Sequence, residues 1–62
     1  MKSREVIKKI KKEGWFEVRV TGSHHHFRHN EKRGTVTVPH PKKEMPIGTI
    51  RSIEKQSGVK LR

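Results

Sequence analysis

Four histidines fall within nine residues of this 62-residue chain, in the stretch TGSHHHFRH that spans residues 21–29. Histidine changes its charge near neutral pH, so such a run can bind a metal ion, carry out acid–base catalysis or simply cover a surface. The chain contains no cysteine and no aspartate. A fifth histidine, His40, stands between Pro39 and Pro41, and we expect it to be a loop residue.

Metal binding and serine chemistry are poorly supported by the residues around this run. His24 and His26 form a His-x-His pair that could chelate zinc or nickel, but a tight site needs a third or fourth ligand. All six acidic residues are scattered glutamates, without the paired carboxylates of a magnesium nuclease. Ser23 lacks the Gly-x-Ser-x-Gly turn and the orienting carboxylate of a serine hydrolase, so it is predicted to be a turn residue. We therefore expect no metal and no small-molecule cofactor.

Acid–base chemistry on RNA fits the residues better, because RNA carries its own nucleophile. A protein need only remove the proton of the 2′-hydroxyl, stabilise the charge on phosphorus and protonate the leaving 5′ oxygen. Histidine suits the proton transfers, and arginine or lysine suits the phosphate charge. From the residues alone, catalysis at His24 and plain RNA binding both remain open.

The charge of the chain points to a polyanionic partner. Lysine and arginine number 16 against six acidic residues, which gives a net charge of +10 at pH 7. Nucleic acid, an acidic protein and an anionic membrane surface are the candidates. No apolar run is long enough to span a membrane and no signal peptide is visible, so we expect a cytoplasmic protein. The patterns of helix-turn-helix and basic-zipper DNA-binding proteins are missing.

Hydrophobic spacing predicts the elements that position the histidines. Residues 3–14 read as a helix with Ser3 as N-cap, an apolar stripe on one face, an exposed lysine face and Gly14 at its end. Residues 46–58 read as a second helix in which Ile47, Ile50 and Ile53 fall at three-residue spacing and which ends at Gly58. Val59 and Leu61 are expected to pack against the core as a short tail. Between the helices, residues 15–21, 24–29 and 35–40 read as strands.

Alternation along the strands predicts which side chains face the helices. In residues 15–21 these are Phe16, Val18 and Val20, which places Trp15, Glu17, Arg19 and Thr21 on the open face. Phe27 must face the helices, so His25 and His29 share its face, while His24, His26 and Arg28 lie on the open one. Val36 and Val38 face inward and Thr37 outward. Trp15 could then stack on a base or pack along the sheet edge.

The resulting fold class is α+β, in the order helix–strand–strand–strand–helix. We expect a single domain over residues 1–62, in which a three-stranded antiparallel sheet carries two helices on one face. This layout resembles the double-stranded-RNA-binding domain.

Several longer segments of the sequence match one protein family. They stand in the same order as in that family and cover nearly the whole chain. The chain resembles the HicA toxins, the mRNA interferases of bacterial and archaeal toxin–antitoxin pairs, in "KKIKKEGW", "RVTGSHHHFRH", "GTVTVPHP" and "KKEMPIGTIRSIEKQSGV". The resemblance implies a double-stranded-RNA-binding-like fold and a metal-independent endoribonuclease that cuts mRNA and halts translation. It also implies a HicB-type antitoxin that covers the active face.

In that family the essential histidine follows a Gly-Ser turn, so the resemblance assigns catalysis to His24. We expect RNA to be bound around it on the open sheet face. The alternative is a non-catalytic RNA-binding module of the same fold, and the feature that separates the two is His24 with its turn. The predicted RNA-binding residues are Trp15, Arg19, Ser23, His26 and Arg28.

Overall fold

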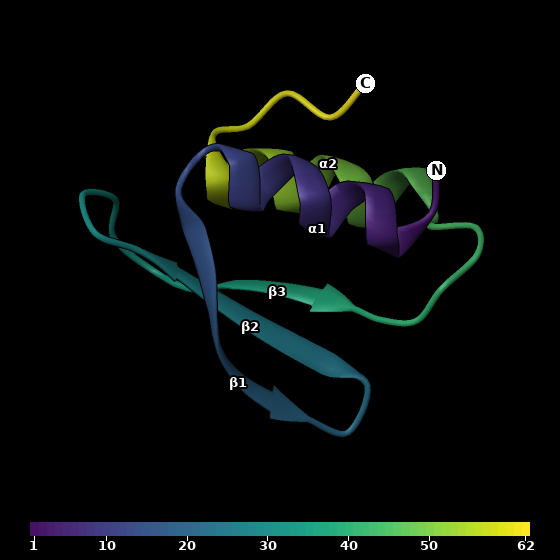
Figure 1. Ribbon diagram of the computed structural model, residues 1–62. Helices are drawn as coiled ribbons and strands as arrows, with labels where there is room; N and C mark the ends of the chain where they lie inside the picture. Colours follow the sequence, from purple (N-terminus) through teal and green to yellow (C-terminus); the bar gives the residue numbers. More distant parts are fainter.

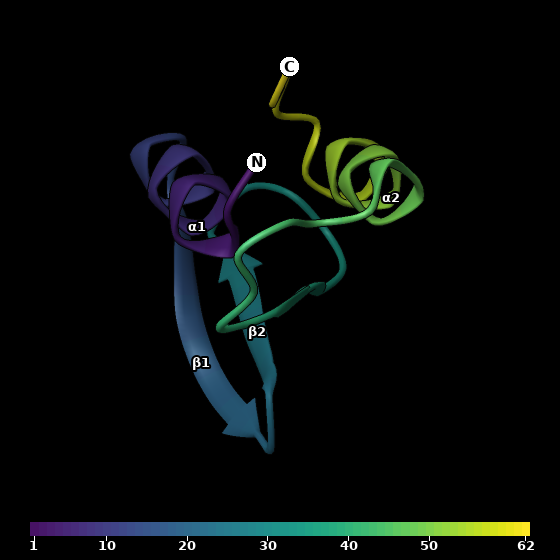
Figure 2. The ribbon, with the colours of Figure 1, turned by 90° about the vertical axis from the view of Figure 1, so that its right-hand side faces the viewer.

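The computed structural model describes residues 1–62 and has the predicted order of elements. The three strands form one antiparallel sheet in the order β1-β2-β3, and both helices lie on the same side of it (Figures 1 and 2). The α+β class and the two-layer arrangement are thus confirmed. The elements are α1 (Ser3–Lys12), β1 (Trp15–Thr21), β2 (His24–His29), β3 (Val36–Pro39) and α2 (Ile47–Ser57).

One hydrophobic core lies between the sheet and the helices. The inward positions predicted for Phe27, Val36 and Val38 are confirmed, since all three side chains are fully buried. Gly58 ends α2 in the left-handed conformation, with φ +72°, and the tail then buries Val59 and Leu61 as predicted. The core comprises Val6, Ile10, Trp15, Phe27, Val36, Val38, Met45, Ile50, Ile53, Val59 and Leu61.

The helix starts differ from the sequence pattern in two ways, and the predicted N-cap is wrong. Ile47 is the first residue of α2, beyond the edge of the core, and its side chain is 52% exposed. Ser3 is not the N-cap of α1, which is Lys2; Ser3 is instead buried, and its hydroxyl accepts the backbone N–H of Lys42 at 2.8 Å. A serine hydroxyl bonds whichever donor the fold presents, and here that donor comes from a distant loop.

The largest departure from the sequence pattern is an irregularity in β1. Glu17 lies opposite Phe27, but Arg19 lies opposite the neighbouring residue His26, so that Val18 is one residue in excess. An extra residue of this kind is a β-bulge, and it shifts the alternation of side chains between the two faces. The predicted pattern therefore holds after the bulge and is reversed before it.

The bulge exchanges the places of Trp15 and Phe16. Trp15 faces the helices and is 2% exposed, whereas Phe16 lies opposite Arg28 and is 42% exposed. Val20, beyond the bulge, lies opposite His25 on the helix side but is 47% exposed. The tip of the β1–β2 hairpin extends away from the helices, so they do not cover Val20 (Figures 1 and 2).

The C-terminal tail is held to α2 by Glu54. One carboxylate oxygen accepts the backbone N–H groups of Leu61 at 2.8 Å and Arg62 at 3.3 Å, and the other accepts the Arg62 guanidinium at 3.2 Å. The hydrogen bond from Leu61 is the main cause that lowers the pKa of Glu54, with the positive charge of Arg62 adding to it. Ionised Glu54 therefore stabilises the packing of Leu61 against the core.

Replacement of this carboxylate should lower stability in a pH-dependent way. Because folding lowers the pKa of Glu54, its contribution is complete above the ordinary carboxyl pKa of about 4.3 and is lost as the pH falls through the lower folded value. Glu54→Gln should melt at a lower temperature than the wild type near pH 7. The two melting temperatures should converge in acid, and a difference that is constant with pH would contradict this account.

Candidate functional site

His24 occupies an exposed position at the start of β2, directly after the turn at Gly22 and Ser23. Across the sheet it lies opposite Thr21 on one side and Pro39 on the other. It is the one histidine of the five whose ring makes no hydrogen bond in the protein. The rings of His25, His26, His29 and His40 are all hydrogen-bonded. The imidazole of His24 is thus free to exchange a proton with a bound molecule.

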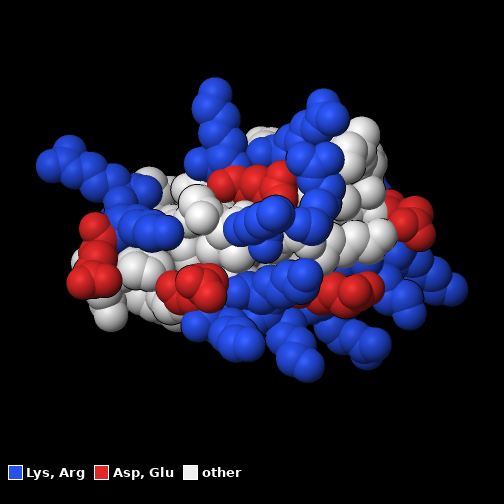
Figure 3. Space-filling model, turned by 90° about the horizontal axis from the view of Figure 1, so that it is seen from above, with Lys and Arg blue, Asp and Glu red and all other residues white.

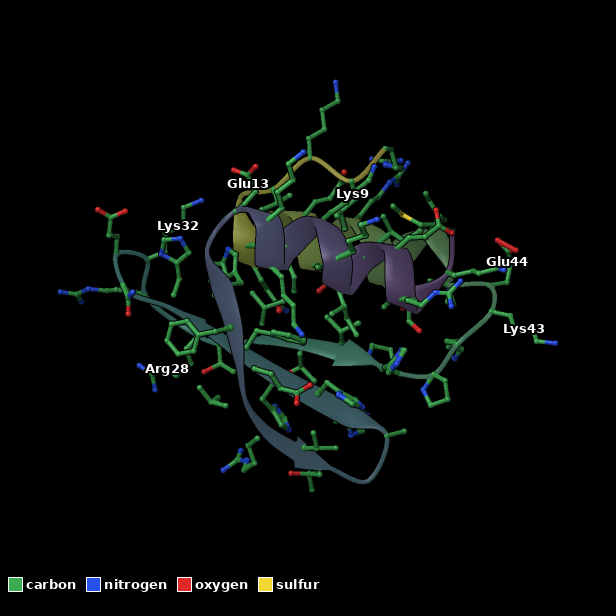
Figure 4. The ribbon with its side chains drawn as sticks, in the orientation of Figure 1. Lys9, Glu13, Arg28, Lys32, Lys43 and Glu44 are labelled. Atoms are coloured by element: carbon green, nitrogen blue, oxygen red, sulfur yellow. The ribbon has the colours of Figure 1, made fainter.

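The open face of the sheet carries several of the predicted residues beside His24. Arg19 lies opposite His26, whose Nδ1 is 3.1 Å from the Thr37 hydroxyl. Arg28 is exposed and points away from the helices, towards the other end of β2 (Figure 4). The structure therefore brings guanidinium and imidazole groups onto one surface, which ends at His24.

Trp15 does not belong to this surface. Its ring is in the core, packed at 5.2 Å from the ring of His29, and its indole N–H is buried without a partner. The predicted open-face position of Trp15 is therefore wrong, because the bulge turns its side chain towards the helices. The exposed aromatic ring on the open face is that of Phe16. Only the pairing register could have revealed it, because the local sequence alternates without a break.

A polar network lies behind His24 on the helix side of the sheet. The Nδ1 atom of His25 is 2.7 Å from a carboxylate oxygen of Glu17, and the rings of His25 and His40 meet edge to face at 4.9 Å. His40 in turn contacts the Ser3 hydroxyl through Nδ1 at 2.7 Å. Its backbone N–H donates to the carbonyl of Ser23 at 2.8 Å, which ties the Gly-Ser turn to the end of β3.

The ring of His29 has a structural role, because both of its nitrogens form hydrogen bonds within the protein. Its Nδ1 accepts the backbone N–H groups of Glu31 and Lys32 at 3.0 and 3.2 Å, so its proton is on Nε2, 2.9 Å from the carbonyl of Glu13. Gly14 adjoins that carbonyl, and a Cβ there would lie 2.7 Å from His29 Nε2. Both nitrogens of this ring are thus occupied, which leaves none for chemistry.

Positive charge alone does not mark one face as the site. Seen from above, the helix side also bears lysine and arginine side chains all round, with a few acidic ones between them (Figure 3). The lysines of α1 are exposed there, as expected of a solvated face. No three histidine or glutamate side chains lie close enough together to hold a metal ion. Neither helix has the length and apolar character needed to cross a membrane.

Comparison with protein families identifies the chain. The model of the HicA toxins of bacterial toxin–antitoxin systems matches residues 3–59 of the 62. The chain belongs to the HicA toxin family. Comparison with curated proteins gave no match. Membership makes this HicA protein the toxin of a toxin–antitoxin pair, and such a toxin has a cognate antitoxin as its partner.

Proposed function

We propose that this HicA protein is a metal-independent endoribonuclease that cuts mRNA in the cytoplasm and thereby inhibits translation. The observation that carries the proposal is His24, an exposed imidazole without a hydrogen-bond partner on a sheet face that also presents Arg19 and Arg28. A toxin needs a target in the cell, and RNA is the polyanion whose cleavage requires no more than proton transfer and charge stabilisation.

In the proposed reaction the neutral imidazole of His24 accepts the proton of a ribose 2′-hydroxyl. The 2′ oxygen attacks the adjacent phosphorus to form a 2′,3′-cyclic phosphate, the bond to the 5′ oxygen breaks, and that oxygen takes up a proton from water as it leaves. Proton transfer by a positioned side chain contributes about 10²–10⁴-fold to a rate. The guanidinium group of Arg19 stabilises the negative charge that gathers on the phosphate, while Arg28, at the other end of β2, binds another phosphate of the strand.

The other residues of the open face bind the RNA. Ser23 and His26 offer hydrogen-bonding groups on either side of His24, and the cations bind phosphates without regard to sequence. The exposed ring of Phe16 takes the stacking role that the sequence suggested for Trp15. Unpaired RNA suits this surface best, because its bases are free to stack.

Cleavage without a metal ion tests the proposed activity. The purified protein should cut single-stranded mRNA in an excess of EDTA at the same rate as in Mg²⁺, because the residues at the site are imidazoles and cations rather than paired carboxylates. Product lengths on a sequencing gel would give the rate. Loss of cleavage in EDTA with recovery on addition of Mg²⁺ or Zn²⁺ would refute the mechanism. Binding of RNA without any cleavage would favour the RNA-binding module instead.

We further propose that the antitoxin is of the HicB type and covers the open face directly. On the edge strand β1, the exposed ring of Phe16 on the open face and the exposed side chain of Val18 at the bulge offer the apolar centre that protein interfaces need. Around it stand Arg19, Arg28 and His24, which an acidic partner would meet with complementary charge. Such a partner would associate quickly at low salt and exclude RNA by occupying its place.

Hydrogen exchange can locate the antitoxin. In a complex with the cognate antitoxin, backbone amides of residues 15–21 and 24–29 should exchange more slowly than in the free toxin, because the partner covers these strands. Protection confined to the outer surfaces of α1 and α2 would show that the face around His24 remains open. Inhibition would then act at a distance from the active site.

A further inference from the structure

A surface pocket of about 510 Å³ lies where the start of α1 meets the loop after β3, and nothing proposed above uses it. Pro41 is its one apolar lining residue. Four of its side chains are lysine or arginine, two from each segment. Besides Pro41, the lining consists of Lys2, Ser3, Arg4, His40, Lys42 and Lys43.

None of the four cations of this pocket forms an ion pair with a glutamate, although the pKa of Glu44, lowered chiefly by the hydrogen bond from the Met1 amine, is lowered further by the charge of Lys2. The ion pairs of the molecule lie elsewhere, and Glu44, which follows Lys43, is bound by the amine of Met1 at 2.8 Å. Figure 4 shows Lys43 extending into solvent from the loop between β3 and α2. Like charges gathered in one hollow repel each other and do not stabilise the fold. An anionic ligand would relieve that repulsion.

The pocket is held in shape by Ser3. Its backbone N–H donates to the carbonyl of Lys42 at 2.9 Å, and its hydroxyl accepts the N–H of Lys42 at 2.8 Å. The arrangement that leaves no group unpaired has this hydroxyl donating to Nδ1 of His40, at 2.7 Å. The neutral ring of His40 then carries its proton on Nε2, which makes no hydrogen bond within the protein.

The pocket lies on the helix side of the sheet, close to the strand end at which His24 faces the open side (Figure 2). Pro39 is the partner of His24 across the sheet, and His40 is the next residue along the chain. With paired Cα atoms about 5 Å apart and consecutive ones 3.8 Å apart, the Cα atoms of His24 and His40 are separated by roughly 6–7 Å. The hydrogen bond from His40 N–H to the Ser23 carbonyl keeps the two segments together. A chain that crosses His24 on the open face can therefore reach the pocket by passing round this end of the sheet.

We propose that this pocket binds a backbone phosphate of the RNA strand, next to the bond that is cut at His24. The inference rests on the proposed ribonuclease function and adds a second phosphate site to it. The strand would run over the open face from Arg28, past Arg19 and His26 to His24, and then round the end of the sheet into the pocket. A phosphate held there would fix the register of the strand, so that the scissile phosphate stays at His24.

The lining favours RNA over an acidic protein as the occupant. Protein interfaces have an apolar centre with charges at the rim, whereas nucleic-acid interfaces are polar and strongly positive throughout. The pocket has cations and hydrogen-bond donors with Pro41 as its one apolar residue, while the exposed apolar side chains of Phe16 and Val18 lie on β1, at the far edge of the sheet from β3. The lining of the pocket thus suits RNA better than an acidic protein.

The test compares two double variants with the same loss of charge. Lys42→Gln with Lys43→Gln removes two pocket cations but keeps the backbone groups of Lys42 that bond Ser3. The control, Lys55→Gln with Lys60→Gln, removes two exposed lysines from the end of α2 and the tail. Each pair is measured for cleavage of a single-stranded RNA of about ten nucleotides. Each is also placed in a His24→Ala protein for binding of the same RNA at several salt concentrations.

The pocket variant should show a kcat/KM about tenfold lower than the wild type, as expected from the loss of one charge-assisted hydrogen bond. Its slope of log K against log salt should be shallower by about 0.7, the value for one phosphate of a single strand. The control variant should change both kcat/KM and the salt slope by less than the pocket variant does. Equal behaviour of the two double variants would overturn the inference, and a pocket variant that weakens only the antitoxin complex would assign the pocket to the antitoxin.

The two proposals can fail separately. Normal cleavage by the wild type with no difference between the two double variants would leave the ribonuclease intact and remove the phosphate site. Absence of cleavage by the wild type, with a shallower salt slope for the pocket variant, would leave the phosphate site and remove the ribonuclease.

Discussion

His24→Ala is expected to lower kcat/KM for RNA cleavage by about 10²–10⁴-fold, the contribution of a positioned acid–base group. The melting temperature should stay close to that of the wild type, because the His24 side chain is exposed and its ring bonds nothing in the protein. RNA binding should also survive, since the arginines and lysines that hold phosphates remain. The measurement is single-turnover cleavage beside thermal melting and RNA binding for the same preparation.

His26→Ala is the matched control for this variant. It removes another imidazole from the same strand and the same face, two residues away, but one whose Nδ1 is engaged with Thr37. Its cleavage should fall far less, in line with a role in binding. If the folded His24→Ala protein cut RNA at the full rate, or if both alanine variants lost activity equally, His24 would not be the specific proton carrier.

Trp15→Ala should lower the free energy of unfolding by about 3–5 kcal/mol, the usual result of removing a large aromatic ring from a core. The ring is 2% exposed and packs against His29, and a domain of this size has only a small core to rely on. The variant is therefore expected to be largely unfolded at 37 °C. Urea or thermal denaturation followed by circular dichroism would measure the effect.

Two neighbouring substitutions make this prediction specific. Trp15→Phe keeps an aromatic ring in the core and removes the buried indole N–H that has no partner, so its cost should be much smaller. Phe16→Ala truncates the adjacent, exposed ring and should change stability by less than about 0.5 kcal/mol while it weakens RNA or antitoxin binding. A Trp15→Ala protein of normal stability that had lost only RNA binding would show that Trp15 is a surface ring after all.

The sequence by itself determined the element order, the two-layer architecture and the position of His24. These depend on local patterns that the fold did not disturb. In β2 the alternation runs without a bulge, so burial of Phe27 was enough to place His24, His26 and Arg28 on the other face. Residues 21–29 and the matching segments before and after them also carried the family resemblance, which the family comparison confirmed.

Only the tertiary structure decided which residues of β1 and of the distant loops join the site. The bulge at Val18 depends on how β1 pairs with β2, and no residue in the alternating sequence announces it, so Trp15 and Phe16 exchange faces unexpectedly. Ser3 lies 37 residues from His40 along the chain, and their hydrogen bond forms only when α1 packs beside the loop after β3. Local patterns report what each segment favours by itself; the pocket depends on contacts between segments, which exist only in the folded chain.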